Sequence, residues 1–499
     1  MNKKRLTAQL LSGVLAAQAC LSAAPIMAKS GTGLDGLKPG GSVTKDPDAV
    51  IFTNDEWKGT DFEAEDGTTK NNVDVFEVNR EDASTSVIPY HDDASAQNSV
   101  WDYNGREQSN YMQMLTGEGE DKTWQLNVVT NPAEAAEFEG ENGFTNKDFS
   151  NPAWKDVSLP CSWTMQGFDF SIYTNQTMPF MTKYGDSTSP NLAPAAPTNY
   201  NPVGMYRKTF DLKEGMLDTN RRVYINFQGV ESAYYVYVNG HEVGYTEDTF
   251  SPHKFDITDY LQEGENFLAV KVLKYSDAIW MEDQDMIYDG GIFRDVFLTS
   301  APLAQISDYK VFTDLDDNYE DALLTVNMDV RNLSSSNLKN WTVDLAVYDT
   351  EGKNILEGTN TERLVHADAE SQNQVKVSTV VKKPKLWSAE HPDLYALVLH
   401  LKDADGNVIE TLSTQLGFRE IGFTRAETDE EGWTTTSKFT PVTINGERLF
   451  LKGADRHDSD PVYGKATPQK TVEEDLKLMK QYNLNAIRTA HYSNDDYLY

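Results

Sequence analysis

An alternation of apolar and polar residues with a period of two runs through most of this chain and restricts it to β-rich folds. The clearest case is RRVYINFQGVESAYYVYVNGHEVGYT, where two β-rich runs flank Asn239-Gly240, a dipeptide that favours a two-residue hairpin turn. Over residues 235–238 tyrosine alternates with valine, so large groups lie on both faces of the strand. Both faces are therefore expected to be covered, and we predict one antiparallel β-sandwich over residues 73–300.

A second β-rich region follows the first. DADGN from Asp403 is typical of a hairpin turn. DLDDNYEDA from Asp314 resembles a calcium loop but lacks the glycine and terminal glutamate spacing of that motif, so we predict a solvated turn. The strand spacing predicts an immunoglobulin-like sandwich with a structural role over residues 301–423. The alternating apolar positions are Leu324, Val326, Met328 and Val330 in one strand and Trp341, Val343, Leu345 and Val347 in another.

The pattern changes again after Gly446. RLFLKGADRH and NLNAIRTAHY are each predicted to form a buried strand, and a helix lies between them, with Thr467 as its N-cap and Pro468 at its first position. Val472, Leu476 and Met479 then recur at helical spacing. This order predicts that residues 424–499 hold a linker and the first βαβ unit of a (β/α)8 barrel. Because such a barrel needs about 250 residues, the barrel is truncated here, and we expect the chain to be the N-terminal part of a longer protein.

The N-terminus has the features of a secretory signal. Three basic residues, Lys3, Lys4 and Arg5, precede an apolar run that ends in small residues, which predicts a signal peptide over residues 1–28. The apolar run is too short and too interrupted to favour the alternative of a membrane anchor. We expect residues 29–72 to form an exposed leader, and the mature protein to be secreted or held at the cell surface, with no transmembrane segment in this chain.

Net charge and cysteine content exclude several classes of protein. The formal net charge of −34 repels phosphate backbones, so nucleic acid is not expected as a partner. Of the two cysteines, Cys20 lies in the predicted signal peptide and Cys161 remains. A single thiol allows neither an intrachain disulfide nor a cysteine-based metal site. The mature protein must therefore depend on its apolar cores for stability.

Polar side chains follow both predicted barrel strands. His457 comes at the end of the first strand and His491 at the end of the second, and each lies near an arginine. The C-terminal ends of barrel strands carry active-site groups. Two histidines could bind a metal, hydrogen-bond a polar substrate or merely pack. A metal site would need a third ligand at suitable spacing, and the sequence shows none.

A third group of polar residues is the acidic stretch YSDAIWMEDQDMIYDGGIFRDVFL, in which Glu282, Asp283 and Asp285 lie within four positions. Acids so close together repel one another unless something compensates. We expect Glu282 and Asp283 to be structural, either in a salt bridge, for which Arg294 is a candidate partner, or in a turn where they satisfy nearby backbone groups. The neighbouring aromatic residues Trp280 and Tyr288 are expected to belong mainly to the core.

These stretches carry a resemblance to a known family. NAIRTAHYSN resembles the first signature of glycoside hydrolase family 2, Asn-x-x-Arg-x-x-His-Tyr-Pro, with Ser493 in place of the proline. The resemblance runs from about residue 73 to the end of the chain. It includes, in order, SWTMQGFDFSIYTNQTMPF, NPVGMYRKTF, EDQDMIYDGGIFRDV, LWSAEHPDLY, GFREIGF and FLKGADRHDSDP.

The resemblance implies a multidomain, mainly β architecture: a jelly-roll sugar-binding domain, an immunoglobulin-like domain and a catalytic (β/α)8 barrel. EDQD resembles the large bacterial β-galactosidases in particular. It implies that Asp285 binds galactosyl hydroxyls and a sodium ion, and that Asn175 is a sugar-binding neighbour. His457 and His491 match histidines that bind the sugar and stabilise the transition state, and Arg488 matches a cation near the nucleophile. The two catalytic glutamates and the magnesium ligands are implied to lie outside this sequence.

The implied function is that of an exported, retaining β-galactosidase acting on terminal β-D-galactosyl residues, with this piece alone inactive. One alternative is β-glucuronidase or another exo-β-glycosidase of the same family, although Arg456-His457 stands where glucuronidases tend to have Lys-His. A second alternative is a non-catalytic carbohydrate-binding surface protein. Homo-oligomerisation and cell-surface attachment through a C-terminal part stay open.

Overall fold

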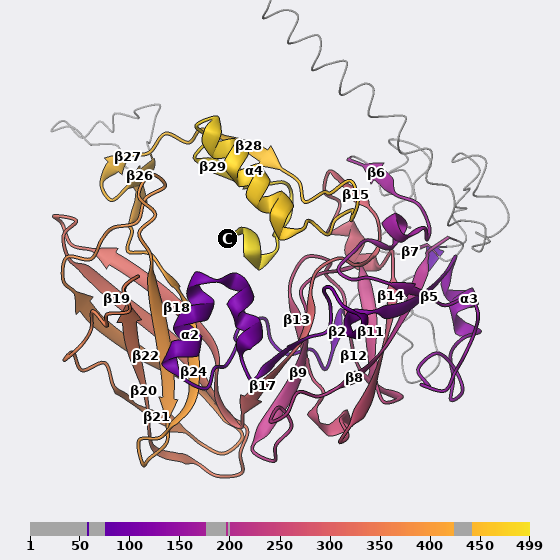
Figure 1. Ribbon diagram of the computed structural model, residues 1–499, viewed down its shortest axis with the longest axis horizontal. Helices are drawn as coiled ribbons and strands as arrows, with labels where there is room; N and C mark the ends of the chain where they lie inside the picture. The colour runs from indigo at the N-terminus through magenta and orange to yellow at the C-terminus, as the bar shows by residue number, and fades with distance from the viewer. Residues whose placement is uncertain (1–56, 59–74, 176–195, 198–199, 424–441) are drawn as a thin grey trace, which may run out of the picture.

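The computed structural model describes residues 57–58, 75–175, 196–197, 200–423 and 442–499. Figure 1 shows two β-sandwiches side by side, with a smaller α/β segment at the C-terminal end of the chain above them. The predicted signal peptide over residues 1–28 lies outside the described residues, as does almost all of the predicted leader over residues 29–72.

The first sandwich has a seven-stranded and a four-stranded sheet, and every strand pair in both is antiparallel. Its core contains Trp124, Trp163, Tyr206 and Phe227, all completely buried. The predicted jelly-roll fold is confirmed. The larger sheet runs β2 (Glu77–Val78), β12 (His241–Thr246), β11 (Ala233–Val238), β14 (Glu265–Leu273), β8 (Val203–Asp211), β4 (Trp124–Val129), β5 (Lys155–Val157). The smaller runs β13 (His253–Asp256), β9 (Arg221–Phe227), β17 (Val296–Pro302), β3 (Met112–Met114).

The predicted hairpin joins β11 to β12. Asn239 and Gly240 have φ angles of 51° and 84°, the left-handed values that a type I′ turn needs at both central positions. Val236 points into the sandwich core, whereas Tyr235 packs on the other face with Ala135 of the short helix α3 (Pro132–Ala136). Both faces of this strand are therefore covered, as the alternation predicted.

The second sandwich has the predicted immunoglobulin-like form. Its sheets are β18 (Ala304–Leu315), β19 (Ala322–Asn332), β22 (Ser371–Val381), and β21 (Arg363–Ala367), β20 (Leu338–Tyr348), β23 (Tyr395–Lys402), β24 (Val408–Leu416). The acidic stretch from Asp314 forms a turn in which Asp316 accepts hydrogen bonds from the backbone N–H groups of Asn318 and Glu320. Within the described part of the chain no group of three or more metal-ligating side chains occurs.

The C-terminal segment contains the predicted strand, helix and strand. β28 (Gly453–Arg456) pairs in parallel with β29 (Ala486–Thr489), and α4 (Gln469–Gln481) lies between them in sequence. Val472 is buried on α4, with Leu476 and Met479 partly buried on the same side. A small antiparallel sheet of β25 (Ile421–Phe423), β26 (Val442–Ile444) and β27 (Glu447–Arg448) precedes this unit.

Two details predicted for this segment are wrong. Pro468 has extended backbone angles and occupies the cap position, so α4 begins one residue later than expected and Thr467 is not its N-cap. The strands are also shorter and less buried than predicted, because RLFLKGADRH divides between β27 and β28. Among the described residues β28 and β29 pair only with each other, and a two-stranded sheet leaves both of its edges open.

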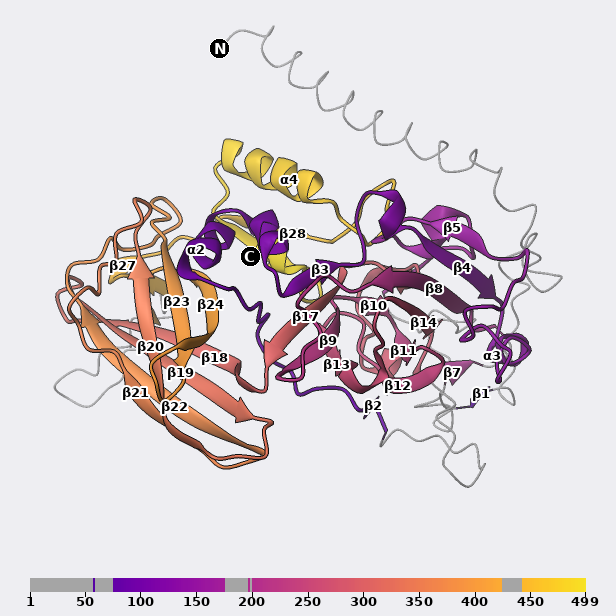
Figure 2. The ribbon, with the colours of Figure 1, turned by 60° about the horizontal axis from the view of Figure 1, so that its bottom comes forward.

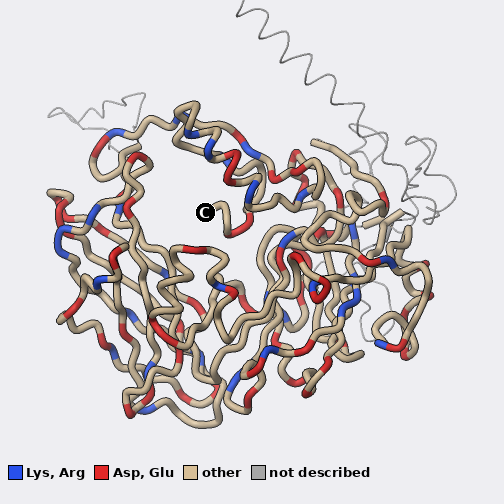
Figure 3. The backbone as a smooth tube through the Cα atoms, in the orientation of Figure 1, with Lys and Arg blue, Asp and Glu red and all other residues tan. Residues whose placement is uncertain are grey.

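Charged groups are spread over the whole molecule. Figure 3 shows acidic and basic residues interspersed along the backbone of both sandwiches and of α4. No helix in the described ranges has the length and apolar character needed to cross a bilayer.

A buried histidine joins the N-terminal segment to the second sandwich. Helix α2 (Asp93–Trp101) lies between strands β2 and β3 of the jelly roll in sequence but packs on β23 and β24, as Figure 2 shows. His400 on β23 contacts Asp344 through Nδ1 at 2.6 Å and Asp93 of α2 through Nε2 at 2.7 Å. The two carboxylates outweigh the effect of burial and raise the pKa of His400 to about 9.

This cluster should make the stability of the second sandwich depend on pH. Since the folded pKa of His400 lies above its unfolded value of 6.5, its contribution is complete below pH 6.5 and disappears as the pH rises through 9. The shift corresponds to at most about 3 kcal/mol. His400→Gln should therefore lower the calorimetric unfolding temperature more at pH 6 than at pH 9.5. His366→Gln, at an exposed position on β21, is the control variant. Equal effects of His400→Gln at both pH values would contradict the assignment.

Candidate functional site

The two predicted histidines lie together at the C-terminal ends of β28 and β29. Parallel pairing sets Asp455 opposite Arg488, and the next residues bring the rings of His457 and His491 to a centroid distance of 5.3 Å with an interplanar angle of 88°. His457 is exposed and His491 partly so. Both imidazoles can therefore reach a ligand at this edge of the sheet.

Arg488 orients one of these imidazoles. Its Nη2 donates to Nδ1 of His491 at 3.0 Å, and its Nη1 lies 3.2 Å from Oδ1 of Asp455. Because Nδ1 accepts, a neutral His491 carries its proton on Nε2. The ring then presents an N–H donor, as recognition of a hydroxyl oxygen requires.

Asp285 and Asn175 also lie together, on the first sandwich. Strand β6 (Ile172–Thr174) pairs with β15 (Met286–Tyr288), and Thr174 lies opposite Met286. The antiparallel register therefore places Asn175 across from Asp285. Tyr173 adds its hydroxyl, which donates to Oδ1 of Asp285 at 2.7 Å. Sequence reasoning missed Tyr173, although its place two residues before Asn175 on a strand was the available signal.

The two other acids of the EDQD stretch have different surroundings. Glu282 accepts hydrogen bonds from the backbone N–H and the hydroxyl of Thr249, both at 2.7 Å. Burial outweighs these bonds and raises the pKa of Glu282 to about 7. Burial also raises the pKa of Asp283, which is more exposed. Glu282 thus holds the neighbouring loop, a structural role as expected.

Of the two expected roles, the contact with nearby backbone is found for Glu282, and the salt bridge with Arg294 is not found. Arg294 donates instead to the carbonyl oxygens of Phe250 at 2.9 Å and Ser493 at 2.6 Å, and lies 3.7 Å from the carboxylate of Asp458. Asp458 and Ser493 belong to the barrel segment. Arg294 therefore joins the sandwich to that segment, because carbonyl oxygens at short range are better placed than the carboxylate of Glu282.

Apolar packing places the two residue groups at one interface. Rings of Phe250 and Tyr492 stack with centroids 4.1 Å apart, and Tyr492 directly follows His491. Met286, directly after Asp285, packs in the same cluster. Trp280 lies at its margin and Tyr288 inside it, in agreement with a core role. The buried members are Phe250, Tyr275, Ile279, Met286, Tyr288, Phe293, Ala466 and Tyr492.

A sodium ion takes several oxygen ligands, and part of such a set is present. Asp285 and Asn175 each adjoin the same end of one strand pair, and the carboxylate and the amide both supply oxygen atoms of the kind that hard cations prefer. The free capacity of the Asp285 carboxylate, beyond its bond from Tyr173, fits one ligand position. Further ligands would have to come from backbone, substrate or water oxygens.

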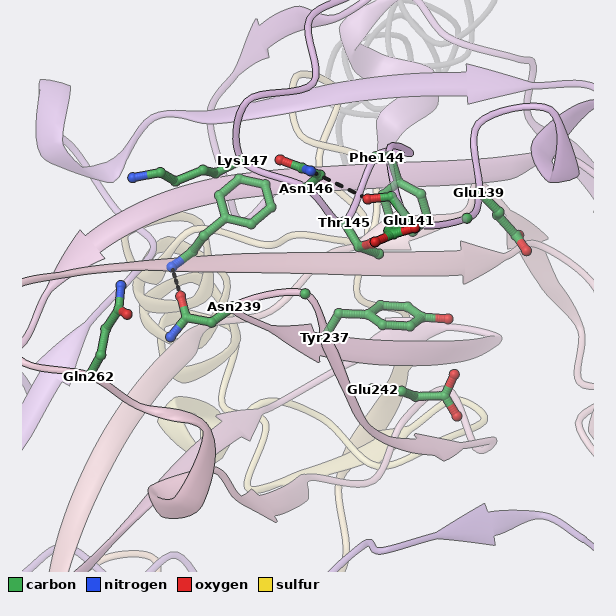
Figure 4. Close-up of a pocket in the computed structure, with 13 residues that line it drawn as sticks. Glu139, Glu141, Phe144, Thr145, Asn146, Lys147, Tyr237, Asn239, Glu242 and Gln262 are labelled. Carbon is green, nitrogen blue, oxygen red and sulfur yellow. Dashed lines mark hydrogen bonds between the residues drawn. The ribbon is translucent and has the colours of Figure 1, made fainter.

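A partly open pocket lies elsewhere on the first sandwich. It has a volume of about 610 Å³ and surrounds Tyr237 beside the β11–β12 hairpin. Figure 4 shows the Tyr237 ring between Glu139 and Glu242. None of the predicted site residues lines this pocket. The histidine and Asp285 groups instead lie at an open edge of the described structure.

Three sequence profiles of one family match the chain in order. They are described as glycosyl hydrolases family 2, sugar binding domain, over residues 121–302; glycosyl hydrolases family 2, over residues 304–419; and glycosyl hydrolases family 2, TIM barrel domain, over residues 437–499. These ranges correspond to the first sandwich, the second sandwich and the α/β segment of the structure.

Relatives of this chain include β-galactosidases. One from Priestia megaterium (strain DSM 319 / IMG 1521) is 41% identical over 86% of this chain and 38% of its own length. One from Vibrio cholerae serotype O1 (strain ATCC 39541 / Classical Ogawa 395 / O395) is 34% identical over 82% of this chain and 36% of its own. The chain thus spans less than two fifths of these proteins.

The fold resembles a solved structure of Bacteroides uniformis β-glucuronidase, with a TM-score of 0.59 and 22% identity over 78% of this chain and 40% of that one. At this identity the likeness concerns the fold alone. The ordered profile matches and the curated relatives agree with the three-part architecture. This chain belongs to glycosyl hydrolases family 2.

Proposed function

We propose that the full-length protein is a retaining β-galactosidase that removes terminal, non-reducing β-D-galactosyl residues from β-galactosides. The observation that carries the proposal is the arrangement of Asp285 and Asn175 on a sandwich ribbon that packs against the strand ends bearing His457 and His491. The β-galactosidases among the relatives support this choice of sugar. A pyranoside carries hydroxyls that need both donors and acceptors in fixed positions.

Each side chain has a specific part in this proposal. The carboxylate of Asp285 accepts hydrogen bonds from sugar hydroxyls, while Asn175 supplies both a donor and an acceptor. Nε2–H of His491 donates to a hydroxyl oxygen, with Arg488 fixing the ring. Bonds that shorten as the sugar ring flattens stabilise an oxocarbenium-like transition state by several kcal/mol. The acid/base and nucleophile glutamates are assigned to later barrel strands, outside this sequence.

Metal ions and export form part of the same proposal. Sodium bound beside Asp285 would supply a positive charge that orients sugar oxygens, and magnesium would be held by residues outside this sequence. The basic and apolar N-terminus supports export, with residues 1–28 removed. The substrate would then be met outside the cytoplasm, at the cell surface or in the surrounding medium.

Substrate preference tests the assignment directly. The full-length protein should hydrolyse nitrophenyl β-galactoside with a higher kcat/KM than the corresponding glucuronide, because Asp285 and its acidic neighbours repel a glucuronate carboxylate. Release of nitrophenol measures both rates. A preference for the glucuronide would reject the galactosidase assignment, and no hydrolysis of any nitrophenyl β-glycoside would favour a non-catalytic carbohydrate-binding protein.

Removing the Asp285 carboxylate should weaken catalysis specifically. A hydrogen bond to a charged group contributes about 1.5 to 3 kcal/mol, so Asp285→Ala should lower kcat/KM for the galactoside by about 10- to 150-fold. Asp283→Ala is the matched control, since it removes the same charge from the same loop at an exposed position. Equal losses in both variants would assign the effect to loop charge rather than to sugar binding.

A further inference from the structure

The ribbon that carries Asp285 has few bonds of its own. β15 and β6 form a two-stranded sheet that pairs with no other described strand, and an isolated two-stranded ribbon is only marginally stable in water. Ile287 and Tyr173 on this ribbon are exposed. The position of Asp285 must therefore be fixed by contacts on the buried face of the ribbon, where Met286 and Tyr288 pack in the apolar cluster.

The carboxylate of Glu231 contacts both the Asp285 ribbon and the barrel segment. Oε2 of Glu231 accepts hydrogen bonds from the backbone N–H groups of Asp289 at 3.0 Å and Gly290 at 2.6 Å, at the end of β15. Oε1 of Glu231 accepts from Nζ of Lys465 at 2.8 Å. Glu231 lies on the first sandwich, and Lys465 on the loop that follows His457 and β28.

Lys465 is held on the sandwich side of this interface. Its side chain is 4% exposed and that of Glu231 2%. Its ammonium lies 5.1 Å from the ring centroid of Phe250 and 5.5 Å from that of Tyr288, and 3.8 Å from Sδ of Met286, the residue after Asp285. Aromatic faces attract a desolvated cation. Lys465 thus touches the ribbon itself as well as Glu231.

The backbone around Lys465 is bound to the sandwich too. The N–H of Lys465 donates to Oγ of Ser162 at 3.0 Å, and the N–H of Ser162 donates to the carbonyl oxygen of Tyr463 at 3.1 Å. Gly464 has a φ of 70°, and a Cβ there would lie 2.6 Å from Oγ of Ser162. The loop therefore approaches the sandwich more closely than a side chain at Gly464 would allow.

From these contacts we infer that Glu231 is a positioning residue of the glycosidase site: through Lys465 it couples the Asp285 ribbon to the loop carrying His457, so that the two segments move as one. The inference rests on the proposed function for its consequence in sugar binding. A buried ion pair contributes little to net stability once desolvation is counted. The hydrogen bonds of the Glu231–Lys465 pair do, however, fix the orientation and the separation of the two segments, which apolar packing alone defines less closely.

The test compares variants of the full-length protein. Glu231→Gln keeps the shape and one acceptor but loses the charge, and Lys465→Arg keeps the cation. Lys271→Met is the matched control, because Lys271 pairs with Glu139 at 2.9 Å on the outer face of the same sandwich. Two measurements are made on each variant: amide hydrogen exchange in residues 282–292 and 457–466, and KM and kcat for the β-glycoside that the wild type hydrolyses fastest.

Glu231→Gln should speed exchange in both segments together and raise KM about tenfold while kcat changes less than threefold. Lys465→Arg should preserve most of the wild-type KM, and Lys271→Met should match the wild type in both measurements. If Glu231 had a purely structural role, its substitution would lower the folded fraction, which reduces the apparent kcat and leaves KM unchanged. Either that outcome or faster exchange in only one of the two segments overturns the inference. If the wild type hydrolyses no β-glycoside, the proposed function fails, and exchange alone decides the coupling.

Discussion

The two groups of candidate site residues meet at one buried interface between the first sandwich and the barrel segment. Phe250 of the sandwich stacks on Tyr492 of the barrel, and Arg294 donates to the Ser493 carbonyl beside it. Asp285 and His491 are each one residue from a member of this apolar cluster. A sugar site built from two domains needs such an interface, because its groups must be held within about half an ångström of the productive geometry.

The β architecture was predictable because local sequence patterns specify its strands and turns. A period of two identifies strands, and Asn239-Gly240 sets the register of its hairpin through backbone angles that few other dipeptides adopt. The errors arose where local rules compete. Thr467-Pro468 satisfies the rule for an N-cap and first helical residue, yet Pro468 also suits the extended cap position it occupies. The hydrophobic RLFL run predicted one buried strand, whereas residues 449–452 belong to no strand and separate β27 from β28.

Residue types at the candidate site were easier to predict than their partners. His457 and His491 follow strands that can be recognised locally, and parallel pairing then brings their rings together. The partners of Arg294 could not be found this way, because Phe250 and Ser493 lie far from it in sequence in opposite directions. Tyr173 reaches Asp285 across more than a hundred residues. Such contacts follow from tertiary packing, within the first sandwich as well as between it and the barrel segment, and a local pattern does not identify the two partners.

Charged side chains fix the orientation of the two parts at this interface, which apolar packing alone would not define. Aromatic and methionine side chains are prominent in its buried cluster, but the hydrophobic effect that favours their burial is non-directional. The carboxylate of Glu231, by contrast, has a fixed orientation, because its two oxygens accept short hydrogen bonds from opposite sides of the interface. Arg294, which also belongs to the sandwich, acts in the same way, with carbonyl oxygens of both parts as its acceptors. Desolvating these charged groups carries a cost in free energy, and the accompanying gain is one defined orientation of the Asp285 ribbon toward the histidines.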